Sequence, residues 1–387
     1  MRVFALLTET NKYSFSPIIA ASEDKIEILK DFAQLKKGDV LLFSFQSTEI
    51  KEMETLLKRV PDGVIKIAGG PHASGLPLHA LEMGFDFVFV GEAEEHLKDL
   101  LNFLKGRENP PPCLWWKGHN GNICQGVEIE KFPPFSKLLP IPIEITRGCP
   151  FLCGYCQTPR IFGGRHRHRS INCIVNWVEI LINRGIKDVR FITPNGMAYG
   201  GNGNKNPQQV VLLFKTLKKR FPAAKFYFGS FPSEFRPEHI DFLTLKELRP
   251  LLANKRIIFG AQTGSDEVLK RLKRGHKMED VFKATEASLK AGFRPEVDFI
   301  FGLPFDDEIQ TIKCMKELAE MGARIHAHYF LPLPSTPLAL EKPREISPSL
   351  LRIIERLTGE GKLFGQWKKQ RELALYLYKM NIEFSLH

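Results

Sequence analysis

The chain of 387 residues has no run of about 18 consecutive apolar residues, the length that a membrane-spanning helix requires. It shows no internal repeat of solenoid period and no long low-complexity tract. Cysteine is scarce, with seven residues in the chain. Three of them lie between positions 149 and 156, an arrangement that is unlike a disulfide framework. The N-terminal segment MRVFALLTET has no cleavage-site pattern, which favours a strand over a signal peptide. These absences predict a cytoplasmic protein without membrane contact, whose cysteines are thiols or metal ligands.

The composition is that of an ordinary globular protein, with 43% hydrophobic and 26% charged residues. A chain of this length is expected to form two domains and a tail. The net charge of +11 permits an anionic partner such as RNA, although Lys and Arg on solvated helix faces also explain such an excess.

Residues 1–108 alternate short β-rich runs with amphipathic segments, which predicts a doubly wound α/β domain with a parallel sheet. The expected strands are Val3–Leu7, Val40–Phe45, Val64–Ala68 and Phe87–Val90. The expected helices are Lys25–Leu35, Ile50–Arg59, Leu76–Met83 and Glu94–Lys105. Ligands collect at the carboxyl ends of parallel strands, so the loops after these strands are the expected binding loops.

Residues 109–139 are rich in proline, glycine and turn formers and are expected to be a linker. Residues 140–337 then resume the alternation, and six β/α units in series predict a partial barrel with its site at the carboxyl ends of the strands. The expected strands are Ile141–Thr146, Val189–Thr193, Lys225–Phe231, Arg256–Ala261, Glu296–Phe301 and Ile325–Leu331. The expected helices are Asn172–Arg184, Pro207–Arg220, Pro237–Leu252, Glu267–Ala291 and Asp307–Met321. Residues 338–387 are basic and predict a helical extension without strands.

Cys149, Cys153 and Cys156 follow the first barrel strand directly, with the spacing C-x3-C-x2-C. Three thiolates in one loop can ligate three irons of a cubane 4Fe–4S cluster, and the fourth iron then stays open for an exchangeable ligand. A zinc site built on Cys153 and Cys156 is the alternative, with its other ligands taken from Cys113, His119, Cys124, His166 and His168. That alternative leaves Cys149 unexplained, and the chain has no second C-x2-C pair.

The motif C-x3-C-x-aromatic-C, with Tyr155 as the aromatic residue, resembles the radical S-adenosylmethionine (SAM) superfamily. The resemblance implies an enzyme in which SAM binds the open iron and is cleaved to methionine and a 5′-deoxyadenosyl radical, while the protein holds SAM and excludes water. It makes Cys149, Cys153 and Cys156 both cluster ligands and catalytic residues. It also implies a reducing partner such as flavodoxin or ferredoxin.

Further segments resemble the SAM-binding parts of the same family, in the same order along the chain. Asn195 lies where the family contacts the SAM amino group, although the usual Gly-Gly-Glu is absent. Gln262 and Ser265 lie in a ribose-like segment, and Arg274 resembles a carboxylate-binding arginine. Ile300 and Gly302 lie in the apolar adenine segment, which departs from the family at Phe305-Asp306, where Gly-Glu is usual.

A doubly wound domain ahead of such a barrel resembles the cobalamin-binding radical SAM methylases. This implies a corrinoid between the domains and methyl transfer to an unactivated carbon or phosphorus centre. The residues implied to contact cobalamin are Ser44, Ser47, Thr48, Gly69, Gly70, His72, Gly91 and Glu92. The chain lacks Asp-x-His-x-x-Gly, so no histidine is expected to ligate the cobalt, and His72 is not assigned that role. A domain that only packs on the barrel or handles substrate is the alternative.

Two other functions fit parts of the sequence. Some segments resemble methylthiotransferases of RNA or protein, but those enzymes carry three further N-terminal cysteines, and the first cysteine here is Cys113. An RNA-binding protein with a structural metal cluster is the non-enzyme alternative.

A run of alternating Arg and His follows the cysteine loop and contains Arg165, Arg167 and Arg169. Unpaired burial of such a cluster is costly, so these side chains are expected to bind an anionic substrate group, with RNA as one candidate. They are equally compatible with an outward orientation or with pairing to acidic residues of the N-terminal domain.

Overall fold

The computed structural model describes residues 1–23 and 25–385. In the N-terminal unit, five parallel strands form a sheet. The strands are β1 (Val3–Ala5), β2 (Glu27–Ile28), β3 (Val40–Ser44), β4 (Ile65–Gly69) and β5 (Phe87–Phe89). Their order is β2-β1-β3-β4-β5, and β6 (Leu114–Trp115) adds an antiparallel edge. The central strand β3 is buried along its whole length, as expected for a parallel sheet that is covered on both faces.

Alternating residues of these strands enter two separate hydrophobic cores, one on each face of the sheet. The helices are α1 (Lys12–Ala21), α2 (Ile50–Leu57), α3 (Gly70–Gly75), α4 (Pro77–Glu82) and α5 (Leu97–Phe103). Leu42 packs with residues of α1 and α5. Phe43 packs on the other face with residues of α2, α3 and α4. The α/β class is therefore as predicted, with helices on both faces of the first sheet.

The expected helix Lys25–Leu35 is wrong. This segment contains β2, which pairs with β1, and a 3-10 turn at Phe32–Gln34 that the Asp31 side chain caps. The helix that follows β1 is instead α1. It was not predicted from the sequence, because Pro17 lies inside it and proline usually interrupts a helix.

Residues 109–139 are not a simple linker. They supply β6 to the N-terminal sheet, and a disulfide joins Cys113 to Cys124. The expectation that every cysteine is a thiol or metal ligand is therefore wrong for this pair. Cys124 also forms a bridge with Gly91, whose left-handed φ of 99° and close approach to the Cys124 carbonyl leave no room for a side chain.

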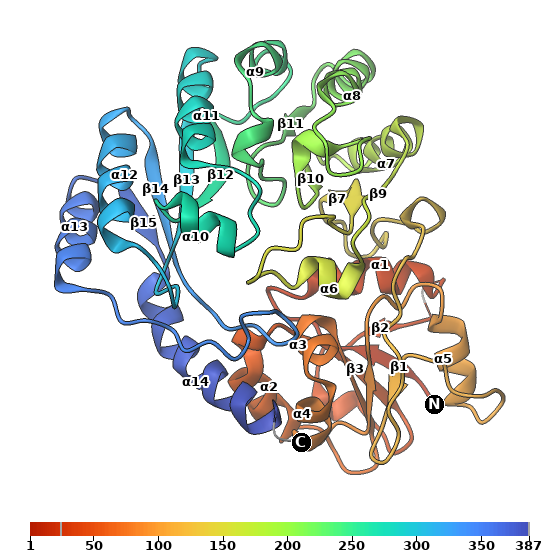
Figure 1. Ribbon diagram of the computed structural model, residues 1–387. Helices are drawn as coiled ribbons and strands as arrows, with labels where there is room; N and C mark the ends of the chain where they lie inside the picture. Colours follow the sequence, from red (N-terminus) through yellow and green to blue (C-terminus); the bar gives the residue numbers. More distant parts are fainter. Residues whose placement is uncertain (24, 386–387) are drawn as a thin grey trace.

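The second unit is an open barrel of parallel strands, seen as an arc from green to blue in Figure 1. Its strands are β7 (Ile143–Glu144), β10 (Asp188–Ile192), β11 (Lys225–Tyr227), β12 (Arg256–Gln262), β13 (Arg294–Phe301), β14 (Arg324–Tyr329) and β15 (Leu363–Gly365). A bridge between Phe235 and Phe259 connects the two halves of the arc. The outer helices are α7 (Ile171–Asn183), α8 (Pro207–Arg220), α9 (Phe242–Leu248), α10 (Asp266–Arg271), α11 (Met278–Lys290), α12 (Glu308–Glu320) and α13 (Pro348–Gly359). Their apolar faces and the outward side chains of the strands share one core.

Several barrel elements differ from their expected bounds. The segment Glu267–Ala291 is divided between α10 and α11, and Pro237–Leu252 between a 3-10 turn (Pro237–His239) and α9. The expected first strand ends in a separate short strand, β8 (Thr146–Arg147), which pairs antiparallel with β9 (Arg167–His168).

The C-terminal extension is not purely helical, because β15 pairs with β14 as a further barrel strand. The last helix, α14 (Trp367–Ser385), then joins the two units: Trp367 and Ala374 lie in the barrel core, whereas Leu377 and Met380 lie in a core of the N-terminal sheet. No helix among the described residues has the length and apolar character that crossing a bilayer demands.

Candidate active site

The cysteine loop lies between β8 and helix α6 (Thr158–Phe162) and is held by backbone hydrogen bonds to distant segments. Cys149 N–H donates to the Gly163 carbonyl at 3.1 Å, and Gly154 N–H donates to the Leu272 carbonyl at 3.0 Å. The Gly154 carbonyl in turn accepts from Leu338 N–H at 3.1 Å. Segments from three parts of the barrel therefore fix this loop.

The three sulfurs are spaced too widely for a single ion. They do not all lie within 4.8 Å of one another, whereas tetrahedral zinc with Zn–S bonds near 2.3 Å holds its sulfurs about 3.8 Å apart. Burial raises the pKa of the Cys149 thiol to about 11, and burial also raises the pKa of Cys156. Such thiols keep their protons unless a cationic centre takes them as thiolates. Three thiols in one loop are a donor set that fits an iron–sulfur cluster, whose usual ligands are thiolates.

Polar side chains surround this loop, and several of them have unpaired atoms. Arg274 Nη1 donates to Cys153 Sγ at 3.7 Å, and its Nη2 donates to the Gly260 carbonyl at 3.2 Å. Asn195 is fully buried; its Nδ2 lies 2.9 Å from His239 Nδ1, but its Oδ1 has no partner among the described residues. A buried acceptor without a donor costs about 1–3 kcal/mol, so an incoming ammonium group would relieve that cost.

A cavity of about 320 Å³ lies between the N-terminal sheet and the start of the barrel. On the sheet side it is lined by the carboxyl ends of β3, β4 and β5, including Ser44, Gly69 and Phe89. On the barrel side it is lined by Glu144 and Arg147, which precede the cysteine loop, and by Ile161 and Phe162 of helix α6, which follows the loop. The carboxyl ends of the parallel strands thus face a largely apolar space, as the sequence analysis expected.

Comparison with known proteins identifies the barrel. The radical SAM superfamily matches residues 143–318, which contain the three cysteines and five of the barrel strands. This chain carries a radical SAM domain.

The relatives of this radical SAM domain differ in activity. The chain is 26% identical to the tRNA-2-methylthio-N(6)-dimethylallyladenosine synthase of Sulfurihydrogenibium sp. over 319 residues, covering 78% of this chain and 69% of that protein. Its fold is similar to the radical SAM methyltransferase TsrM from Kitasatospora setae, solved with cobalamin and a 4Fe–4S cluster (TM-score 0.69, 16% identity, 88% of this chain and 77% of that one). It is also similar to the cobalamin-dependent radical SAM enzyme OxsB (TM-score 0.60, 15% identity, 81% and 51%).

The expected SAM residues of the radical SAM domain lie on one side of the barrel, at the carboxyl ends of its strands. Gln262 ends β12 with a left-handed φ of 72°. Ile300 packs beside Tyr155 in a small apolar cluster that is separate from the main core. Gly302 has a φ of 74°, and a Cβ there would lie 2.5 Å from the Tyr329 ring, so only glycine fits. The Ser265 side chain caps α10 by accepting from Val268 N–H.

The expected cobalamin residues divide into two groups. The cavity is lined by Ser44, Gly69, Gly70, Gly91 and Glu92. Ser47, Thr48 and His72 do not line it: Ser47 Oγ lies 2.9 Å from His72 Nδ1, and His72 Nε2 lies 2.9 Å from His79 Nδ1. Burial, with a smaller effect of the His79 charge, lowers the pKa of His72 to about 3, so this ring is neutral in the fold.

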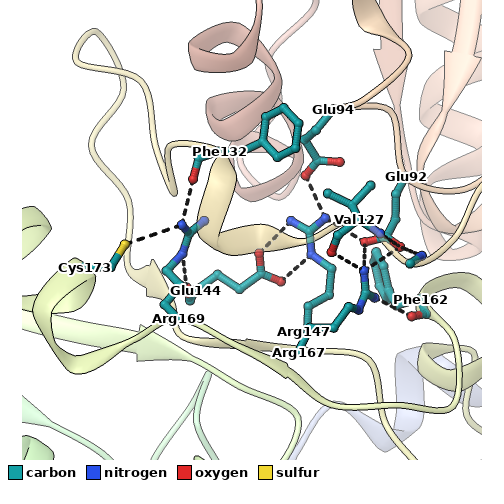
Figure 2. A network of polar contacts seen from close by, with 11 residues as sticks. Glu92, Glu94, Val127, Phe132, Glu144, Arg147, Phe162, Arg167, Arg169 and Cys173 are labelled. Atoms are coloured by element: carbon teal, nitrogen blue, oxygen red, sulfur yellow. Dashed lines mark hydrogen bonds and ion pairs between the residues drawn. The ribbon is translucent and has the colours of Figure 1, made fainter.

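Glu92 is the centre of an ion-pair network at the domain boundary (Figure 2). Arg147 Nη1 lies 2.9 Å from Glu92 and 2.7 Å from Glu94, while its Nη2 lies 2.6 Å from Glu144. These carboxylates outweigh the cost of burial and hold the pKa of Arg147 well above its usual range. The pairing of Arg147 with Glu94 and Glu144 was not predicted from the sequence, since no local pattern signals pairing across the boundary.

The basic run after the cysteine loop is not a free cationic patch. Arg167 is buried and pairs with Glu92, and buried Arg169 donates to the carbonyls of Glu144 and Phe132. Arg165 is exposed and pairs with Glu128. The Arg167–Glu92 pair corresponds to the alternative in which the run pairs with acidic residues of the N-terminal domain, whereas Arg169 binds backbone carbonyls.

The inner face of the barrel carries polar residues that the sequence analysis did not single out. Glu234 precedes Phe235, whose side chain packs outward into the core. Burial raises the pKa of Glu234 to about 7, and the charge of Asp298 contributes to this shift. Asp298 lies on β13, opposite His326 of β14. Strict alternation in Arg324–Tyr329 could have revealed this face, because its apolar residues are every second one.

Proposed function

We propose that this radical SAM enzyme is a cobalamin-dependent methyltransferase that acts on an unactivated carbon or phosphorus centre. The observation that carries the proposal is the cavity between the two units, with the carboxyl ends of β3, β4 and β5 on one wall and, on the other, Arg147 and helix α6, which flank the cysteine loop. The likeness to TsrM covers 88% of the chain, so it includes both units.

When bound, the cluster and SAM supply the radical, and a corrinoid supplies the methyl carrier. The chain's own residues hold and orient these groups. Cys149, Cys153 and Cys156 would ligate the cluster, Asn195 and Arg274 would bind the polar end of SAM, and Ile300 would contact its adenine. The apolar lining of the cavity would exclude water from the path between the two units.

Methylthio transfer is the second candidate, and the relative from Sulfurihydrogenibium favours it. That chemistry is expected to use a second cluster on three further cysteines. No cysteine precedes Cys113, and Cys113 is joined to Cys124, so the chain as given offers no second set of three thiolates beside the first sheet.

Counting iron and cobalamin in anaerobically reconstituted protein tests the proposal. Methyl transfer predicts about four irons per chain together with one bound cobalamin, whereas methylthio transfer predicts about eight irons and no cobalamin. Failure to bind cobalamin under reducing conditions would refute the proposal.

A variant pair tests the binding place. Ser14 is an exposed residue of α1 that lines the cavity, so Ser14→Trp is expected to fill the space and abolish cobalamin binding while the iron content stays unchanged. Ser14→Ala keeps the cavity open and serves as the matched control. Equal cobalamin binding by both variants would place the corrinoid elsewhere.

The reducing partner and the substrate class also belong to the proposal. We propose a small electron carrier such as flavodoxin or ferredoxin as the reductant, because the cluster must receive an electron for each cleavage of SAM. We retain an anionic substrate, but Arg165, Arg167 and Arg169 are no longer its expected ligands. SAM cleavage that proceeds with flavodoxin and its reductase in place of a chemical reductant would support this partner.

A further inference from the structure

Two neighbouring strands bring three metal-ligating side chains together on the inner face of the barrel. On β13, Val297, Phe299 and Phe301 point into the outer core, and on β14, Ile325, Ala327 and Tyr329 do the same. Asp298, His326 and His328 therefore point inward, toward the lumen. Figure 1 shows β13 and β14 side by side on the left of the barrel.

The potential ligand atoms of these residues lie within 4.8 Å of one another. Asp298 Oδ1 lies 2.9 Å from His326 Nδ1 and 3.8 Å from His328 Nε2. The side chains keep some contact with the lumen, with exposed fractions of 14% for Asp298, 30% for His326 and 34% for His328. Ligand atoms at these separations can share one ion with bonds near 2.1 Å, and the residual exposure gives an ion access.

The surroundings fix the orientation of the ligands and carry charges of both signs. His326 stacks on Phe364 of β15 with ring centroids 4.6 Å apart, which fixes its orientation. Two residues before Asp298 on β13, Glu296 lies 3.0 Å from Arg256 and 3.1 Å from Arg324. These three side chains together carry a charge of +1. Asp298 and the nearby Glu234 carboxylate add two negative charges when ionised. Asp298 contributes a carboxylate and the two histidines contribute imidazole nitrogens, which are donor types that a cation in the lumen would need.

We propose that Asp298, His326 and His328 bind a divalent transition-metal ion, of the zinc or ferrous iron class, inside the barrel. Two imidazoles and one carboxylate are a ligand set that such ions favour. The ligand set belongs to neither the cysteine loop nor the cavity between the domains, and the proposal does not depend on cobalamin or methyl transfer.

The site is connected to the cluster loop through neighbouring strand residues and Arg274. Asp298 is opposite Gly260 in the strand register, and the Gly260 carbonyl accepts from Arg274, the residue that contacts Cys153. His328 is opposite Ile300 of the expected adenine segment. Three protein ligands leave coordination positions open, so the ion would act as a Lewis acid that holds an oxygen or nitrogen donor of the substrate within the lumen.

Zinc binding to the full-length, cluster-loaded protein tests the proposal. In anaerobic equilibrium dialysis against zinc, the wild type is expected to hold one zinc per chain in addition to its cluster iron. Asp298→Asn, His326→Gln and His328→Gln are each expected to weaken this binding at least about 100-fold. His119→Gln removes an exposed imidazole far from the barrel strands in sequence and is expected to leave binding unchanged.

Iron content and X-ray absorption keep the test decisive. Unchanged iron in the lumen variants shows that the barrel and its cluster loop remain folded, so zinc loss then reports the site itself. The zinc edge of the wild type is expected to show nitrogen and oxygen scatterers only. Zinc that is absent from the wild type, that is retained equally by the three variants, or that has sulfur neighbours would overturn the proposal.

Discussion

Arg167 donates to both carboxylate oxygens of Glu92, with Nη1 2.9 Å from Oε1 and 3.0 Å from Oε2. Glu92 follows the last parallel strand of the N-terminal sheet, and Arg167 lies in β9, which pairs with the strand just before Cys149. The pair therefore ties the cluster loop to the wall of the cavity between the two units. Both side chains of the pair are buried, with exposed fractions of 3% for Arg167 and 0% for Glu92.

Glu92→Gln is expected to destabilise the protein strongly, because it leaves Arg167 buried without a carboxylate partner, whereas Arg147 keeps Glu94 and Glu144. Breaking one partner of a buried pair typically costs about 3–5 kcal/mol. Chemical denaturation with tryptophan fluorescence measures the free energy of unfolding. Arg165→Gln is the matched control, because its pair with Glu128 is exposed and worth about 0–1 kcal/mol. Similar losses in the two variants would contradict this account of the boundary.

Cys149→Ala, Cys153→Ala and Cys156→Ala are each expected to abolish formation of 5′-deoxyadenosine from SAM under chemical reduction, because each removes a cluster ligand. Cys173→Ala and Cys314→Ala are expected to keep it, because neither residue belongs to the cysteine loop. Cys113→Ala should also keep SAM cleavage but lower the free energy of unfolding by about 3 kcal/mol, since it opens a cross-link between residues 11 apart. SAM cleavage that survives loss of Cys149 would rule out the assigned ligand set.

Local signals predicted much of the fold. Helix α8 has the expected bounds because Asn206 caps it and Pro207 is its first residue, two features that are visible in sequence. The cysteine spacing likewise predicted the radical SAM domain, which matches residues 143–318. Errors occurred where tertiary pairing overrides local preference: Glu27 and Ile28 are a strand because β1 lies beside them, and α1 forms in spite of Pro17.

Contacts between distant residues could not be predicted in the same way. Arg167 is separated from Glu92 by 75 residues, so its sequence context gave equal weight to substrate, solvent and an acidic partner. The inner face of the barrel is an intermediate case. The alternation in β14 indicates that His326 and His328 share a face, but only the register with β13 brings Asp298 to them.

Arg274→Gln is expected to weaken SAM binding by about 1–3 kcal/mol while iron content stays unchanged, because a charge-assisted hydrogen bond is lost. Asn195→Ala should act in the same direction through its unpaired Oδ1. Ser265→Ala is the informative comparison: as a helix cap it should cost about 1 kcal/mol of stability and leave SAM affinity unchanged. Isothermal titration with SAM under anaerobic conditions measures these affinities. A large loss of affinity in Ser265→Ala alone would show that Ser265 contacts SAM and that Arg274 and Asn195 do not.

Asp306 stands where the superfamily usually has glutamate, and it gives the protein a pH-dependent stability. Burial raises the pKa of Asp306 to about 6, although its Oδ1 accepts from Thr263 Oγ1 at 2.6 Å. A carboxyl group with a raised pKa binds its proton more tightly in the folded state, so its stabilising effect is complete below the unfolded pKa near 4 and is lost as the pH rises through 6. Asp306→Asn removes this titration. We therefore expect the variant to gain about 1–3 kcal/mol relative to the wild type between pH 4.5 and pH 7.5, measured by urea denaturation. A difference between the two proteins that does not change over this pH range would show that Asp306 is not buried as an ionisable group.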